Sequence, residues 1–143
     1  MKPRALFLYR FFSLAQAAVF AVVGLLFLIL PGLVLGFFNR LSQPLGMAPS
    51  PLQAGSFYPV LAVAYMYLVT LLAWRMARRP ADPLPPRLLA HAKFASSILS
   101  LAFFFGTAPY LVYLANAGVD AGIGALALWL LRLQKRHSAS WPT

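Results

Sequence analysis

The residues of this 143-residue chain best suited to chemistry are Asn116 and Asp120, which lie close to the end of a long apolar segment. Asp120 is one of only two acidic residues, and an ionisable group among apolar residues is costly and usually functional. With Thr107 and Arg40, these residues could form a small polar pocket for a ligand. The interpretation that we favour is local: Asp120 caps the helix that follows it, because a carboxylate accepts hydrogen bonds from free N–H groups at a helix N-terminus.

A second group of candidates is basic. Lys93 and His91 lie near the start of the third apolar segment. We expect Lys93 to extend its ammonium group to the lipid headgroups while its aliphatic stem lies along the helix. The alternative is a site for an anionic lipid headgroup, formed by Lys93 with Arg75 and Arg87. His91 lacks the further ligands that a metal or haem would need, and we expect no metal and no cofactor.

Composition predicts that these residues belong to a membrane protein. Hydrophobic residues make up 62% of the chain and charged residues 10%, whereas soluble domains carry roughly 25% charged residues. Four apolar segments with short connections use nearly every position, so we expect an all-α, four-helix bundle that forms one membrane domain over residues 1–143. The net charge of +10 does not indicate nucleic-acid binding, because the basic residues flank apolar segments.

The basic residues also predict the orientation of the bundle. Except for Arg40, they gather before the first apolar segment, around the connection between the second and third, and after the fourth. Because Lys and Arg are enriched on the cytoplasmic side of membrane proteins, we expect both termini and the connection 75–87 to be cytoplasmic. Frequent Arg and Pro with few Lys is typical of GC-rich bacteria, so the expected location is the bacterial inner membrane.

About 20 apolar residues in a helix cross the roughly 30 Å of hydrocarbon in a bilayer. The predicted spans are 11–38 with a kink at 31–32, 57–74, 88–114 with a break near 109, and 119–133. We expect residues 39–56 to form an irregular external loop, because prolines punctuate them. The fourth span rises only about 23 Å as a helix and should depend on its neighbours.

Small residues predict where the helices pack, because helix association in a bilayer relies on close approach. Ser96 and Ser100 lie one helical turn apart in the third segment, and Gly118 and Gly122 form a GxxxG pattern in the fourth, with Gly124 and Ala125 following. We expect both stripes to pack inside the bundle, with homodimerisation as the alternative. The aromatic clusters 65–67 and 103–105 could line a slot for a lipid tail, quinone or carotenoid, although such residues more often face lipid or core.

Catalysis is not indicated. The chain has no cysteine, no P-loop, no HExxH and no GxGxxG, and its two acidic residues are predicted on opposite sides of the membrane. We expect a non-enzymatic accessory or scaffold protein, or a binder of a lipid or other hydrophobic small molecule. Its expected partners are membrane lipids and another membrane subunit or a second copy. The alternative is a small transporter or a membrane-embedded enzyme that uses Asn116 and Asp120.

The overall layout resembles that of small four-helix bacterial inner-membrane proteins, including the DoxX-like ones. The resemblance covers the whole chain and consists of its length, its expected topology and its short loops.

Overall fold

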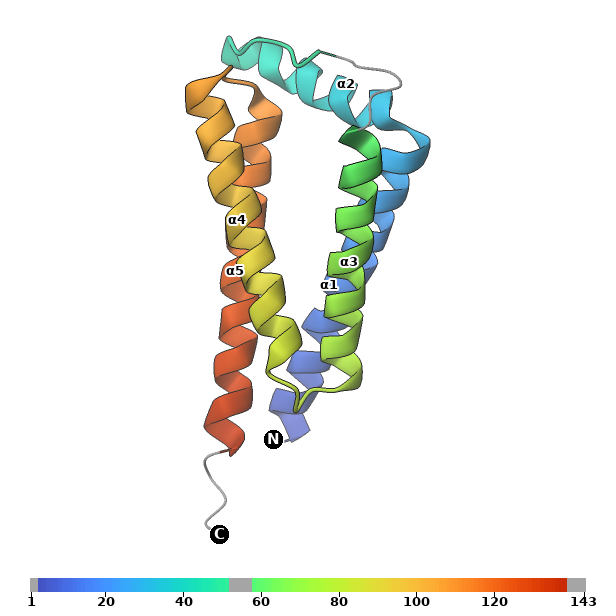
Figure 1. Cartoon of the computed structure of the whole chain (residues 1–143), viewed down its shortest axis with the longest axis vertical. Helices are drawn as coiled ribbons and strands as arrows, with labels where there is room; N and C mark the ends of the chain where they lie inside the picture. The colour runs from blue at the N-terminus through green and yellow to red at the C-terminus, as the bar shows by residue number, and fades with distance from the viewer. Residues whose placement is uncertain (1–2, 52–57, 139–143) are drawn as a thin grey trace.

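The computed structural model describes residues 3–51 and 58–138, and all regular secondary structure in these residues is helical (Figure 1). The elements in chain order are α1 Pro3–Ile29, α2 Pro31–Ser42, the 3-10 helix η1 Gln43–Leu45, α3 Tyr58–Arg78, α4 Leu84–Gly106 and α5 Leu111–Ser138. Within the described ranges, four helices (α1, α3, α4 and α5) are long and apolar enough to cross a membrane.

The four long helices form two antiparallel pairs, α1 with α3 and α4 with α5 (Figure 1). The pairs approach each other at the end where both chain termini lie and diverge toward the opposite end (Figure 1). There α2 lies across the gap and reaches α5. We call these the termini end and the α2 end.

The packed core explains why the pairs meet at the termini end. Each long helix contributes one large, fully buried side chain there: Tyr9 from α1, Met76 from α3, Leu89 from α4 and Leu130 from α5. Toward the α2 end the helices lose this shared core. The two pairs therefore part, and the space between them becomes available for a site.

Proline sets the boundary between α1 and α2. α1 ends at Ile29, Leu30 adopts a non-helical conformation (φ −133°, ψ 51°), and Pro31 opens α2. Proline lacks a backbone N–H and clashes with the preceding turn, so it begins a helix readily and interrupts one within its length. The predicted span 11–38 with a kink is therefore corrected to a long helix followed by a separate helix that changes direction.

The predicted third and fourth spans also need correction. α4 ends at Gly106, and residues 107–110, which include Pro109, connect it to α5. The break near Pro109 is thus the end of one helix and not a kink within it. As a result α5 begins at Leu111 and is 28 residues long, so the prediction of a short fourth helix over 119–133 is wrong.

The remaining connections are more ordered than predicted. The predicted loop 39–56 starts inside α2 and contains η1, and its residues 52–57 lie outside the described ranges. Asn39 closes this segment, since its side-chain amide donates to the backbone oxygen of Ser50 and its side-chain oxygen accepts from the Ser50 N–H, each at 2.8 Å. At the termini end the connection between α3 and α4 shortens to residues 79–83.

Candidate functional site

An ion pair lies inside the bundle between α4 and α5. The Lys93 ammonium nitrogen is 2.8 Å from Oδ1 of Asp120, and the two residues are only 2% and 3% exposed. Charges removed from solvent to this extent are stable only when paired. The structure therefore joins two residues that the sequence had assigned to different sites.

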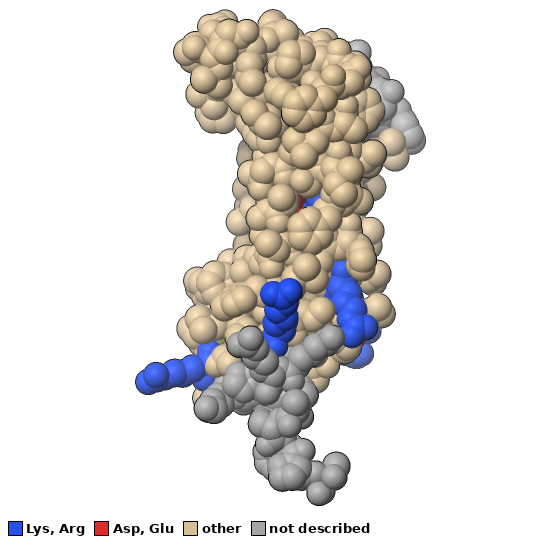
Figure 2. All heavy atoms as spheres, turned by 90° about the vertical axis from the view of Figure 1, so that its left-hand side faces the viewer, with Lys and Arg blue, Asp and Glu red and all other residues tan. Residues whose placement is uncertain are grey.

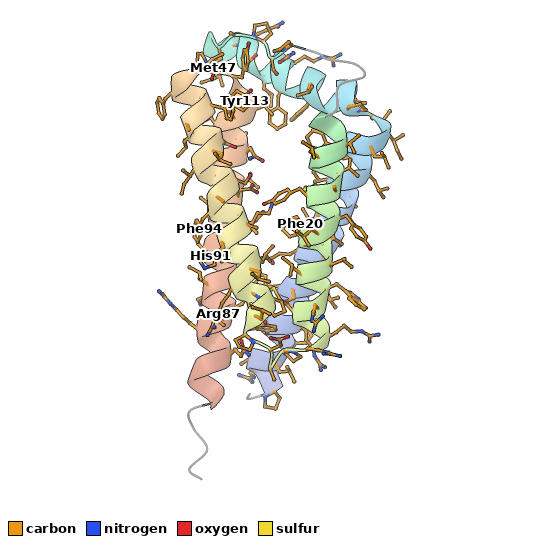
Figure 3. The ribbon with its side chains drawn as sticks, in the orientation of Figure 1. Phe20, Met47, Arg87, His91, Phe94 and Tyr113 are labelled. Atoms are coloured by element: carbon orange, nitrogen blue, oxygen red, sulfur yellow. The ribbon has the colours of Figure 1, made fainter. Side chains whose placement is uncertain are left out.

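Lys93 also contacts the other helix pair. Its ammonium nitrogen lies 4.6 Å from the ring centre of Phe20 in α1 and 5.0 Å from that of Tyr65 in α3. Figure 3 shows Phe20 in the space between the two helix pairs. A cation over aromatic faces is attracted by their negative electrostatic potential. All four long helices thus meet around one lysine.

These contacts overturn two sequence-based expectations. Asp120 does not cap α5, because the helix begins at Leu111 and Asp120 lies well inside it. Lys93 does not extend outward, because its amino group is directed to the carboxylate of the neighbouring helix. The cap interpretation failed because Pro109 was placed within the third helix, which moved the start of the next helix too far along the chain.

The predicted headgroup site does not form around Lys93. Arg75 and Arg87 are exposed, whereas Lys93 is buried between helices. Arg75 instead lies 3.8 Å from the carboxylate of Asp82 in the α3–α4 connection. Arg87 and His91 are both exposed on the part of α4 nearer the termini end (Figure 3).

Asn116 belongs to a polar contact between α4 and α5. Its side-chain nitrogen donates to Oγ of Ser96 at 3.2 Å and to Oγ of Ser100 at 2.8 Å. Beside it, Oγ of the buried Ser97 donates to the backbone oxygen of Ala117 at 2.8 Å. These bonds confirm that the serine stripe of α4 packs against a neighbouring helix.

The glycine stripe behaves differently. A Cβ atom placed on Gly118 or Gly122 would meet nothing within 4 Å, so neither glycine lies in a close helix contact. The tight position is Gly124, where a Cβ atom would lie 3.1 Å from the ring of Phe94 in α4. The expectation that Gly118 and Gly122 form the packing face is therefore wrong.

Thr107 and Arg40 are not part of the same cluster as Asn116 and Asp120. Thr107 is exposed at the end of α4, where its backbone N–H donates to the oxygen of Phe103 at 3.0 Å. Arg40 is exposed in the last turn of α2. None of the hydrogen bonds or ion pairs in the described residues joins either of them to Asn116 or Asp120.

An open cleft of about 410 Å³ lies toward the α2 end, between α3 and the α4–α5 pair. Ligand pockets commonly have volumes of about 300–1,000 Å³. Figure 3 shows Tyr113 near the α2 end of α5. None of the lining residues is charged, and most of their surface is apolar: they are Tyr65, Ala92, Ala95, Ser96, Leu99, Ser100, Phe103 and Tyr113. The cleft therefore suits a hydrophobic molecule.

Tyr65 connects the cleft to the ion pair. Its ring both lines the cleft and faces the Lys93 ammonium group, and its hydroxyl donates to the backbone oxygen of Ala92 at 3.1 Å. Figure 2 shows a small opening near mid-height of one face, through which red and blue atoms are visible; the other blue residues of this face lie toward the termini end. The buried charges are thus immediate neighbours of the cleft.

No group of three side chains that could hold a metal ion occurs among residues 3–51 and 58–138. Comparison with protein-family models, with curated proteins and with solved structures finds no match for the chain. Functional reasoning therefore depends on the geometry of the cleft and the ion pair.

The sequence contained a signal for the ion pair. Lys93 lies near the start of the third apolar segment and Asp120 near the start of the fourth, and opposite charges in adjacent helices of a bundle tend to pair. The cleft had a weaker signal, since only the aromatic clusters 65–67 and 103–105 suggested a hydrophobic slot. Residues from both clusters, Tyr65 and Phe103, line it.

Proposed function

We propose that this chain is a multi-pass protein of the bacterial inner membrane that binds a lipid or other hydrophobic small molecule in the cleft between its two helix pairs. It acts as a non-enzymatic accessory protein, alone or beside another membrane subunit. The observation that carries this proposal is the cleft itself, with its volume of about 410 Å³ and uncharged, largely apolar lining.

The proposed location is supported by the surface of the long helices. They bury one stripe each and leave many large apolar side chains exposed, among them Leu25, Leu28, Ile98 and Phe105. Exposure of such a large apolar surface to water is unfavourable. In a membrane the same surface would contact lipid tails, which are as apolar as leucine. Apart from the atoms visible through its small opening, the face shown in Figure 2 has its blue residues toward the termini end, in keeping with both termini being cytoplasmic.

The proposal can be tested by filling the cleft. Ala95 lines it, so Ala95→Phe should occupy the space that a ligand needs. Ala102, which is also exposed on α4 but does not line the cleft, provides the matched variant Ala102→Phe. Native mass spectrometry of protein purified in mild detergent should show a bound small molecule on the wild type and on Ala102→Phe, and little on Ala95→Phe. Equal retention by both variants would contradict binding in the cleft.

The buried ion pair favours a second candidate function, a small transporter. Ionisable residues inside membrane bundles frequently mark substrate or proton pathways. In proteoliposomes, a proton flux that depends on an added cleft ligand and is abolished by Asp120→Asn would support transport. Retention of a ligand without any such flux would support binding alone.

A further inference from the structure

We propose that the ligand of the cleft is an uncharged amphiphile with a planar ring that carries hydrogen-bond-accepting oxygens, the chemistry of a lipid-soluble quinone. This inference rests on the proposed binding function and specifies its ligand class. Three properties of the cleft lead to it: the absence of charge in its lining, the hydroxyl groups on one wall and the aromatic rings around it.

The first property excludes charged headgroups. None of the lining residues is charged, and the nearest charges, Lys93 and Asp120, neutralise each other at 2.8 Å. A phosphate or carboxylate in the cleft would lose hydration without gaining a counter-ion, which is strongly unfavourable. Arg40 in the last turn of α2 does not line the cleft and so offers no counter-ion inside it. Phospholipids and fatty acids therefore fit the cleft poorly.

The second property selects for acceptor oxygens. Ser96 and Ser100 both line the cleft and both accept a hydrogen bond from Asn116. A hydroxyl that accepts at its oxygen still has its O–H to donate. The two serines lie one helical turn apart, a rise of about 6 Å. One wall thus presents uncharged hydroxyl groups, of which that of Ser96 also interacts with the side chain of Tyr65, and such groups suit carbonyl or ether oxygens on a ring.

The third property selects for a planar ring. Phe103 and Tyr113 face each other across the α4–α5 boundary with ring centres 5.9 Å apart, and Tyr65 contributes a third ring from α3. Aromatic side chains pack favourably against flat conjugated rings in offset or edge-on arrangements. Because the cleft is open, an apolar tail attached to the ring can leave it along the helix surface.

A panel of probes on the wild-type protein tests the ligand class. Decylubiquinone carries the proposed ring, oxygens and tail; decylbenzene lacks the oxygens; decanoic acid carries a charge in place of the ring. Dissociation constants measured in dodecyl maltoside should be lowest for decylubiquinone. Tighter binding of decanoic acid or decylbenzene would overturn the proposed class.

Variants then locate the binding. Ser96→Ala combined with Ser100→Ala should weaken decylubiquinone about tenfold, since two hydrogen bonds are lost, and should leave decylbenzene unchanged. Ser13→Ala is the control, because Ser13 bonds only within α1, to the backbone oxygen of Tyr9. An equal loss for both probes would contradict the role of the hydroxyl groups.

The outcome also separates this inference from the function on which it rests. If decanoic acid binds best and Ala95→Phe removes it, the cleft is a binding site but the quinone class is wrong. If Ala95→Phe abolishes the binding of none of the probes, the proposed binding function fails as well. If decylubiquinone binds best and Ala95→Phe removes it, both proposals are supported.

Discussion

At the scale of single residues, the feature that most needs explanation is a lysine and an aspartate buried in an apolar interior. Burying such a pair seldom stabilises a protein more than apolar residues of similar size would. Removing one partner is different, because the other then remains as an unpaired buried charge. Lys93 and Asp120 should therefore behave as a unit.

This argument predicts a strongly non-additive mutant cycle. Asp120→Leu alone should lower the free energy of unfolding by about 3–5 kcal/mol, because Lys93 would stay buried without its counter-ion. Lys93→Met with Asp120→Leu should cost much less, because no charge is left behind. Unfolding by SDS in mixed micelles measures Asp120→Leu, Lys93→Met and the double variant. A double variant as unstable as the sum of the two single variants would contradict the pairing argument.

Residue-level prediction from the sequence was partly successful. Asp120 and Asn116 stood out because polar groups in apolar segments are expensive, and both do contact α4. Their partners were missed, since pairing depends on where α5 begins and on how it is rotated against α4. Sequence spacing alone does not contain that rotation.

At the scale of elements, helix packing depends on which glycines meet a neighbour. A Cβ atom on Gly124 would lie 3.1 Å from the Phe94 ring, whereas one on Gly122 would meet nothing within 4 Å. The two positions lie in the same helix, so intrinsic helix propensity affects both alike. Only the contact with α4 distinguishes them.

We therefore predict opposite outcomes for two matched substitutions. Gly124→Leu should lower the stability of the bundle by about 1–3 kcal/mol, because the added side chain must displace Phe94. Gly122→Leu should cause no loss. Thermal melting in detergent compares the two, and a greater loss for Gly122→Leu would show that α5 is rotated differently against its neighbours.

The existence of the long helices was predictable, because long apolar runs between basic clusters leave few alternatives. The residues at which the helices begin and end were harder to predict. Pro31 and Pro109 were read as a kink and a break within helices, whereas one begins a new helix and the other lies in a connection. Proline fits all of these roles, and tertiary packing decides between them.

At the scale of the whole molecule, the division into two helix pairs was not predictable from the sequence. The apolar faces of all four long helices look alike, and the all-helical bundle follows from them. Which helices pair closely depends on local contacts, such as that of Gly24 in α1 with Met66 in α3. A Cβ atom added to Gly24 would lie 3.1 Å from the Met66 side chain. The cleft is a consequence of that division, and the aromatic clusters 65–67 and 103–105 were its only sequence signal.

The proposed orientation of the whole molecule depends on where its charges lie. The two ends of the bundle differ sharply, since the described basic residues other than Arg40 and Lys93 lie in segments at the termini end. Four helices are long and apolar enough to cross a membrane; if all four cross it, the chain returns to the side on which it began, and both termini should share the cytoplasm with the α3–α4 connection. Alkaline phosphatase, which is active only outside the cytoplasm, should be active when fused after Ser50 and inactive when fused at the C-terminus. A cytoplasmic reporter should give the reverse pattern. Phosphatase activity at the C-terminus would mean an odd number of crossings, and would rule out a cytoplasmic location for both termini.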